Sequence, residues 1–489
     1  MFDWISLTTR ADLDKLSDYV SGEYAPNYVA EKLQDGFSDD VKAVLIEQPY
    51  IDKDYRSTYY HFYAKKGLNY RADCVRLHFF DQWVTFDPTT LQLTVDPGAG
   101  SATALTDHYI GYMVLRPTNV TTIGRSVVSP HVRLGAKGRI IASEHKVHVL
   151  GYKLTVRGFP WMEQHIDISR CAHAACWAIL RHYSERFSNY REYSIHDVTM
   201  MAQPFNPGGL VPSLGLKVPQ AERVFQEAGT FPVRITRRNR CDVSFYRQLA
   251  ACLDSGFPLF AALNSLQHAV TIVGFDWRTR PNPAVIGLRH SWDEMDSLTI
   301  IDDNHLPYIS IPTADAGIPY CTGDIDEFIV PFPEKLFYPP QAMERLVPVL
   351  FAFDKFLGLP SQDESVVRYF VTTGAALKYF VREQYSGLDP KLMHAVMELP
   401  LPQFVWIVEF STSEQWQTRR VTARAIIDAT ASFTERLPLW LFHTTKKALI
   451  FNREKIGIKL ADMFREMDLP GSTSGALSRM EKNLHQIRI

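Results

Sequence analysis

The chain has 489 residues, of which 46% are hydrophobic and 22% charged, the balance of a folded protein with more than one hydrophobic core. The 52 basic side chains nearly match the 54 acidic ones, so the overall charge excludes a general attraction to nucleic acid or to an anionic membrane. Six cysteines without a paired CxxC spacing argue against a disulfide framework and against a zinc site.

The N-terminal sequence predicts a protein without a secretory signal. Asp3, Arg10, Asp12 and Asp14 occupy positions where a signal peptide needs an apolar core. Later apolar stretches, such as LVPVLFAF from Leu346, are too short to cross a bilayer. We therefore expect a cytoplasmic protein with no membrane and no nucleic-acid partner, and the sequence leaves its oligomeric state open.

Residues 1–155 are predicted to form a β-rich domain of unknown function after a helical opening. Apolar or alternating runs between turn residues indicate strands at residues 41–50, 74–80, 83–87, 91–95, 109–117 and 146–156. Glu144, His145 and His148 are residue types that bind metals, but no fourth ligand is placed beside them. We interpret them as residues on the surface of a strand.

Residues 156–335 have a different pattern, with helices first and strands afterwards, which indicates an α+β domain and not alternating βαβ units. The pattern predicts helices at residues 171–186, 218–229 and 243–256, and strands at residues 258–265, 267–276, 284–290 and 298–304. The Pro- and Gly-rich stretch at residues 203–219 is either a wall or lid of a cleft or a rigid connector between two helices.

Residues 336–489 are predicted to be a mixed region of helices and strands with no readable function. Strands are expected at residues 403–411, 437–445 and 447–453. The tail after Lys459 reads as helical and polar, and Gly471 with its neighbouring serines indicates a loose end. A basic cluster at Arg234, Arg237, Arg238 and Arg240 is interpreted as a solvated loop and not as a polyanion site.

The residues that suggest chemistry lie in the middle region. A thiol hydrolase needs a cysteine thiolate, a histidine beside it, a group that orients the histidine and an oxyanion donor. Cys171 begins the predicted helix CAHAACWAILRHYSER, where the helix dipole favours a thiolate. His268 opens the buried run HAVTIVGFD and would be held firmly at the mouth of a strand.

Candidates for the other two roles stand on either side of this pair. Asp302, Asp303 and Asn304 end the strand LTIIDDN, and one of them can accept the second imidazole N–H. Strand alternation places Asp302 and Asp303 on opposite faces, so only one can serve; Asp302 is preferred, with Asp303 and Asn304 as alternatives. Gln164, just upstream of the cysteine, is the candidate oxyanion donor.

Cys176 is the rival nucleophile, because CWAIL is similar to the sequence around the nucleophile of papain. It lies well inside the predicted helix, however, and is twelve residues from Gln164. His173 and His182 share that helix and are interpreted as surface or packing residues. Cys171 is therefore the preferred nucleophile.

These segments resemble the papain-like peptidases that process bacteriocin leaders. CAHAACWAILRHY aligns without a gap with the CGPAALAMVLRYY type of motif, and SGFPLFAALNSLQHAVTIVGFD is similar to the strand block that carries the histidine. PSLGLKVPQAERVFQEAG and LTIIDDNHLPY resemble the remaining segments, so the resemblance covers residues 160–312. Ala172 and His173 stand where the family has Gly and Pro.

The resemblance implies a papain-like domain with Cys171 as nucleophile, His268 as base and Gln164 as oxyanion donor, and with an orienting acid at the end of the strand LTIIDDN. It implies a cysteine peptidase that hydrolyses a peptide or isopeptide bond through a thioacyl-enzyme. Non-proteolytic acyl transfer on the same site, such as transglutamination or deamidation, and an inactive binding module are the alternatives. We expect a protein or peptide substrate and no metal or organic cofactor.

Overall fold

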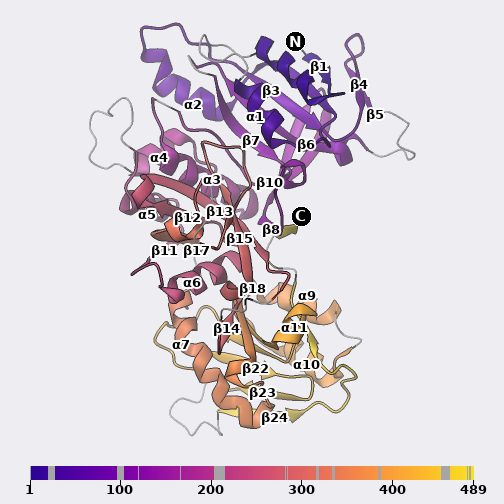
Figure 1. The fold of residues 1–489 in the computed structure, drawn as a ribbon, viewed down its shortest axis with the longest axis vertical. Helices are drawn as coiled ribbons and strands as arrows, with labels where there is room; N and C mark the ends of the chain where they lie inside the picture. The colour runs from indigo at the N-terminus through magenta and orange to yellow at the C-terminus, as the bar shows by residue number, and fades with distance from the viewer. Residues whose placement is uncertain are drawn as a thin grey trace.

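The computed structural model describes residues 2–19, 28–95, 104–118, 121–165, 167–202, 215–280, 282, 285–314, 319–332, 336–383, 387–452, 463–481, 483 and 486–489. The fold is α+β, with three main sheets that follow one another along the long axis of the molecule (Figure 1). The N-terminal sheet lies at one end and a seven-stranded sheet at the other.

The N-terminal sheet is antiparallel in the order β1-β2-β3-β6-β7 and is covered on both faces. Val44 and Ile46 of β2 pack in one hydrophobic core with helix α1, whereas Ala43 and Leu45 face helix α2 and the hairpin β9–β10, as the two-residue period of a strand requires. The elements are β1 (Phe2–Ser6), α1 (Tyr28–Gly36), β2 (Ala43–Tyr50), α2 (Lys53–His61), β3 (Cys74–Phe80), β4 (Val84–Asp87), β5 (Gln92–Val95), β6 (Tyr109–Arg116), β7 (Thr122–Val128), β9 (Ser143–Val149) and β10 (Tyr152–Gly158).

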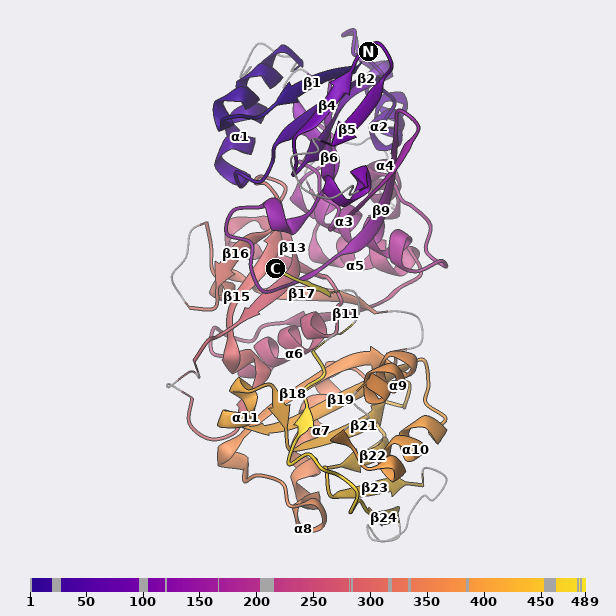
Figure 2. The ribbon, with the colours of Figure 1, turned by 90° about the vertical axis from the view of Figure 1, so that its right-hand side faces the viewer.

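The middle sheet positions the candidate site and is antiparallel in the order β11-β17-β12-β13-β15-β16. Helices α3 and α5 pack together over it, and helix α6 lies between this sheet and the C-terminal one (Figure 2). The elements are α3 (Cys171–Arg186), α4 (Ile195–Ala202), α5 (Val218–Glu227), β11 (Phe231–Thr236), α6 (Val243–Asp254), β12 (Leu259–Leu263), β13 (His268–Trp277), β15 (Met295–Ile301), β16 (Ile309–Pro312) and β17 (Glu327–Phe332).

Two short strands from distant parts of the chain extend the middle sheet. β8 (Arg139–Ile141) pairs with the second half of β13, and β26 (Gln486–Arg488) pairs with β8. Gly274 permits this approach, because a Cβ atom there would lie 2.4 Å from the carbonyl oxygen of Arg139. The C-terminus therefore lies against the middle sheet and not at the far end of the molecule (Figure 2).

The C-terminal sheet has the order β14-β18-β19-β21-β22-β23-β24, and its central strands are buried on both faces. Helices α9 and α10 cover one face of this sheet, and α6 and α7 cover the other. The elements are β14 (Arg289–His290), α7 (Pro340–Leu350), α8 (Asp354–Leu357), β18 (Ser365–Thr373), α9 (Gly374–Glu383), α10 (Pro390–Glu398), β19 (Phe404–Thr412), α11 (Ser413–Gln417), β20 (Arg420–Val421), β21 (Ala423–Asp428), β22 (Leu439–His443), β23 (Lys447–Phe451), β24 (Phe464–Asp468) and β25 (Leu477–Ser478).

A buried charge network joins α6 to the C-terminal sheet. Arg368 of β18 donates two hydrogen bonds to Asp254, at 2.6 and 2.9 Å, and a third to Glu409, at 3.0 Å. Arg424 donates to the other oxygen of Glu409 at 2.7 Å. All four side chains are at least 98% buried, so the two parts share an interior that has no contact with water.

Most predicted elements are confirmed, and two expectations are wrong. The expected strand at residues 284–290 is reduced to β14, whose two residues pair in parallel with β18 of the C-terminal sheet. The described part of the tail is extended, with β24, β25 and β26, and is not helical. Nor is it a loose end, because the N–H of Gly471 donates to Asp389 and Met480 is buried.

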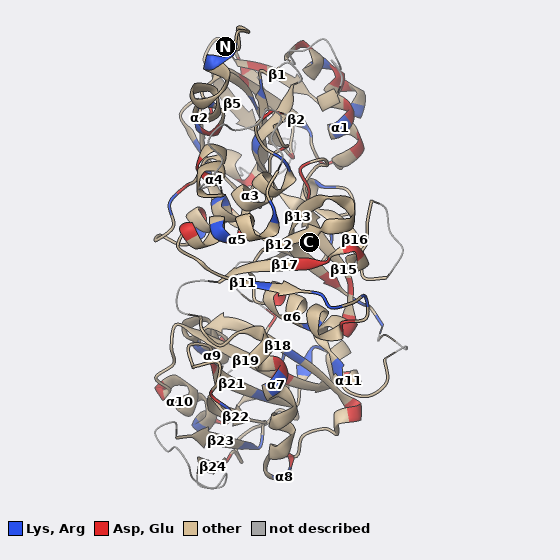
Figure 3. Cartoon of the chain, turned by 90° about the vertical axis from the view of Figure 1, so that its left-hand side faces the viewer, with Lys and Arg blue, Asp and Glu red and all other residues tan. Residues whose placement is uncertain are grey.

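The domain boundaries predicted near residues 155 and 335 stay predictions, because strands cross both of them: β8 and β26 belong to the middle sheet, and β14 belongs to the C-terminal sheet. Basic and acidic side chains are interspersed over all three parts of the chain (Figure 3). Among the described helices, none combines the length and apolarity needed to span a bilayer.

Candidate active site

Cys171 is the first residue of helix α3. Arg170 before it is in extended conformation, and the first-turn N–H groups of a helix lack intrahelical acceptors. Ala172, Ala174 and Ala175 are buried, and their small side chains allow the helix to lie close to β13. There the hydroxyl of Thr271 donates to the carbonyl of Ala175 at 3.3 Å. The cysteine is thus held at the edge of a rigid helix–sheet contact while staying partly exposed.

His268 is the first residue of β13, and its two ring nitrogens face two different partners. Its Nε2 atom is 3.0 Å from Oδ1 of Asp302. The remaining nitrogen, Nδ1, is left for the Cys171 side chain, whose interaction with the histidine contributes to the raised pKa of the ring. Gln267 before it has a left-handed φ of 51°, which turns the chain sharply into the strand.

His268 and Asp302 each stabilise the charged form of the other. Burial alone would lower the pKa of His268, but the hydrogen bonds and negative charges of Asp302 and Cys171 outweigh it and raise the pKa to about 10. Burial opposes ionisation of Asp302, yet the hydrogen bond and charge of His268 lower the pKa of that carboxyl to about 2. At neutral pH the histidine is therefore an imidazolium beside a carboxylate.

Asp302 is fixed from several directions. Its Oδ1 also accepts the backbone N–H of Asn304 at 2.9 Å, its Oδ2 accepts a short hydrogen bond from the hydroxyl of Tyr320, and its carbonyl oxygen accepts the indole N–H of Trp161 at 2.7 Å. A carboxylate held in this way presents one oxygen to His268 in a single geometry.

Asp303 lies beside this pair, contrary to the expectation from strand alternation. β15 ends at Ile301, so residues 302–304 form a turn in which neighbouring side chains need not face opposite sides. The ligand atoms of His268, Asp302 and Asp303 lie within 4.8 Å of one another. Such a trio could hold a metal ion, but His268 and Asp302 already hydrogen-bond to each other.

The Asp303 carboxyl is itself unusual. It is 95% buried, and neither oxygen has a hydrogen-bond donor among the described residues. Burial first, and then the negative charge of Asp302, raise the pKa of Asp303 to about 7. Two neighbouring carboxyls thus differ in pKa because only Asp302 hydrogen-bonds to the imidazolium.

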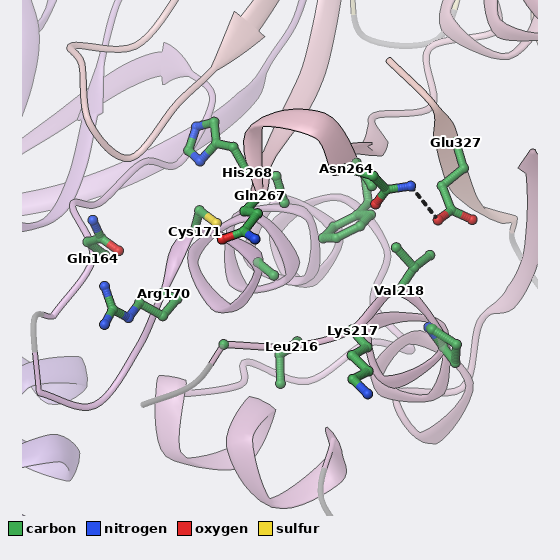
Figure 4. A pocket seen from close by; sticks show the side chains of 16 residues that line it. Gln164, Arg170, Cys171, Leu216, Lys217, Val218, Asn264, Gln267, His268 and Glu327 are labelled. Atoms are coloured by element: carbon green, nitrogen blue, oxygen red, sulfur yellow. Dashed lines mark hydrogen bonds between the residues drawn. The ribbon is translucent and has the colours of Figure 1, made fainter. Parts of the chain in front are cut away.

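Gln164, Cys171 and His268 line one cleft of about 880 Å³ (Figure 4). The side-chain amide of Gln164 donates to Oδ1 of Asn304 at 3.3 Å, a long bond that leaves its second N–H free to turn toward the cleft. Asn304, the alternative orienting residue, therefore contacts the candidate oxyanion donor and not the histidine.

The rest of the cleft extends away from the cysteine and is mixed in character. Residues 215–219 form one wall, and Phe260 adds an apolar surface. At the far end the amide of Asn264 donates to Glu327 at 3.2 Å (Figure 4). The predicted wall or lid at residues 203–219 is thus seen at its last residues, whereas residues 203–214 lie outside the described part of the chain.

The structure does not bring the rival residues to this site. Cys176 is completely buried, which raises the pKa of its thiol well above the ordinary value. The expectation that Glu144, His145 and His148 lie on a strand surface is wrong for His145, which is buried with its Nε2 2.9 Å from the hydroxyl of Ser143, and is confirmed for the other two. In the basic cluster, Arg234 pairs with Glu327 and Arg237 with Asp326.

Two residues of the site were missed from the sequence. Tyr320 and Trp161 both anchor Asp302, yet they come from a loop 18 residues after it and from a segment 141 residues before it. A tyrosine in a loop and a buried tryptophan carry no spacing signal that would connect them to an aspartate. His305 is a second histidine near Asp302, with its Nε2 3.9 Å from Oδ2 of that residue.

The sequence matches no protein-family model, and it matches none of the curated proteins with which it was compared. Function must therefore be inferred from the chemistry of the site.

Proposed function

We propose that the protein is a papain-like cysteine peptidase acting on a peptide or isopeptide bond. The observation that carries this proposal is the position of His268, which hydrogen-bonds to the carboxylate of Asp302 through Nε2 and lines the same cleft as Cys171 at the start of a helix. This arrangement lines an open cleft, as attack on an external substrate requires.

The proposed reaction begins when His268 holds the Cys171 proton and the thiolate attacks the substrate carbonyl carbon. The carbonyl π electrons move to oxygen, and the resulting oxyanion meets the first N–H groups of α3 and the Gln164 amide. His268 then donates its proton to the departing nitrogen as the C–N bond breaks, which leaves a thioester on Cys171 and releases an amine.

Water completes the cycle. His268, now neutral, takes a proton from a water molecule as its oxygen attacks the thioester carbonyl carbon. Collapse of the second tetrahedral intermediate breaks the C–S bond, releases a carboxylic acid and restores the cysteine with its proton shared with the histidine. Asp302 stabilises the imidazolium in each half and keeps the ring in one orientation.

The proposal is tested by alkylation with iodoacetamide at about pH 7, followed by mass spectrometry of each cysteine. A thiolate beside an imidazolium should react at least about tenfold faster than Cys241, the exposed reference cysteine of the same chain. His268→Ala and Asp302→Asn should slow the labelling of Cys171, whereas Cys176→Ala should leave it unchanged. Equal rates at Cys171 and Cys241 would overturn the proposal.

A mixture of peptides of diverse sequence then reports turnover. New peptide termini produced by the native protein and absent with Cys171→Ala would establish hydrolysis. Incorporation of an added primary amine in place of water would instead establish acyl transfer by the same thioester. An alkylation-competent protein that yields neither product would be a binding module.

A further inference from the structure

A second pocket, of about 360 Å³, lies at the junction of the middle sheet, the C-terminal sheet and the end of the chain. It is formed by the last two residues of β13 and the turn after them, by the start of β8, by α11 and the turn after it, and by β26 with the segment that leads to it. Six arginines from these segments line it: Arg139, Arg278, Arg280, Arg419, Arg479 and Arg488.

Three acidic residues, Asp276, Glu294 and Glu481, also line the pocket, but they do not neutralise the six arginines. Asp276 faces Lys137 at 3.5 Å, and Glu294 is held by Arg289 at 2.8 Å, so each of these carboxylates already meets a cation from outside the lining.

The third acid, Glu481, pairs with both Arg139 and Arg479. Within the described parts of the chain, no ion pair involves Arg280, Arg419 or Arg488, and all three are exposed.

The floor of the pocket is rigid. The guanidinium of Arg479 lies 4.5 Å from the ring centre of Trp416, and the Trp416 ring packs edge-to-face on Trp277 at 5.1 Å. Arg139 is 93% buried and donates to the carbonyl oxygen of Glu481 at 2.6 Å. Burial, with the charge of Arg368 nearby, lowers the pKa of Arg139 to about 10 despite the opposing charge of Glu481.

We propose that this pocket binds a small polyphosphate anion, with two or more linked phosphate groups. Guanidinium groups bind phosphate oxygens through paired N–H donors, and three exposed arginines around a fixed cationic floor match several adjacent phosphates. The volume suits a nucleoside triphosphate or a short inorganic polyphosphate, which share this chemistry, and is too small for a nucleic-acid duplex.

Such a ligand would bridge separate parts of the fold. Arg280 follows β13, Arg419 follows α11, and Arg488 belongs to β26, so one bound anion would tie the last strand to both sheets. Binding should therefore raise the thermal unfolding temperature as well as give a measurable heat. The inference does not depend on the proposed peptidase activity.

The test is calorimetric titration of the full chain with inorganic tripolyphosphate, ATP and adenosine in about 150 mM salt. We expect saturable binding of tripolyphosphate and ATP with a Kd below about 1 mM, and none of adenosine. ATP that binds more tightly than tripolyphosphate would show that the nucleoside adds contacts, and equal affinities would show that phosphates suffice. Adenosine binding as tight as that of ATP would overturn the inference.

The decisive variant is Arg280→Glu combined with Arg488→Glu, both exposed positions where folding should be unaffected. It should weaken tripolyphosphate binding at least about tenfold, while Arg240→Glu, an exposed arginine outside this pocket, should change it less than about twofold. Unchanged affinity in the double variant, or no saturable binding up to about 10 mM tripolyphosphate, would overturn the inference.

Discussion

Asp302 and Asp303 are adjacent in the chain, equally acidic in free form and both buried, yet the fold shifts their pKa values in opposite directions. Asp302 meets an imidazolium, a tyrosine hydroxyl and a backbone N–H, so its negative charge is compensated. Asp303 meets the negative charge of Asp302 and no donor within the described residues. Partners, and not residue type, decide which of two buried carboxyls is ionised.

Asp303→Asn should stabilise the folded protein above pH 7. The pKa of Asp303 is about 7 when folded and near the ordinary value of 3.8 when unfolded, so the unfolded chain loses this proton at lower pH. Stability therefore falls as the pH rises from about 4 to about 7, and the loss persists above pH 7. Asparagine does not ionise, so urea unfolding at about pH 8 should give a free energy higher by at least about 1 kcal/mol.

The control for Asp303→Asn is the same substitution at an aspartate elsewhere in the chain. Asp39→Asn, at an exposed position, should leave the pH dependence of unfolding unchanged. Parallel stability curves for native protein and Asp303→Asn between about pH 4 and pH 8 would show that Asp303 ionises normally in the fold.

Sequence reasoning could single out the cysteine, the histidine and the preferred acid as candidates because each stands at the edge of a strongly patterned element. Cys171 starts a helix and His268 starts a strand, and the structure brings these two side chains and Asp302 together. The expectation that only one of the neighbouring aspartates faces the site depended on alternation, which does not apply beyond the end of β15 at Ile301. Tyr320 could not be found because its role arises only from tertiary contact.

At the scale of elements, long strands were predictable and very short ones were not. β13 and β19 have nine or ten residues with a continuous apolar pattern, enough to identify a buried strand. β8 and β26 have three residues each, and β14 has two, so no periodicity exists to be read. Their conformation is imposed by the neighbouring strands, and this is why the tail was wrongly expected to be helical.

Gly274→Ala should break the attachment of β8 to the middle sheet. The added Cβ would lie 2.4 Å from the backbone oxygen of Arg139, which cannot move without separating the two strands. We expect a loss of about 2 kcal/mol or more in the free energy of unfolding, because two backbone pairings and the β26 contact beyond them are disturbed. Denaturant unfolding measures the loss.

Gly67→Ala is the control, because a Cβ there has no neighbouring atom within 4 Å. Hydrogen exchange locates the effect, and faster exchange at β8 and β26 should accompany the lower stability. A Gly274→Ala protein as stable as Gly67→Ala would show that β8 contributes little to the sheet.

At the scale of the whole molecule, the middle and C-terminal parts are joined through buried charges. Asp254 ends α6, Arg368 and Glu409 lie on adjacent strands of the C-terminal sheet, and the charges compensate one another without water. The two parts should consequently unfold together in one transition.

Asp254→Asn should destabilise the protein by about 3–5 kcal/mol, since Arg368 would lose the buried carboxylate that binds it through two hydrogen bonds. Differential scanning calorimetry should show the single transition divide into two. The double replacement Asp254→Leu and Arg368→Met should recover part of the loss, because it removes both charges. A double variant less stable than Asp254→Asn would contradict this account.

The pairing of β26 with β8 also has a consequence for synthesis. Residues 486–488 are translated about 345 residues after Arg139–Ile141, which at roughly 5–20 residues per second is a delay of about 17 to 70 s. During that interval the outer edge of β8 offers unpaired N–H and C=O groups on a sheet that is otherwise able to form. A nascent chain on the ribosome thus carries an open strand edge until residues 486–488 have been made, and slow or stalled ribosomes prolong the exposure of this edge to other chains.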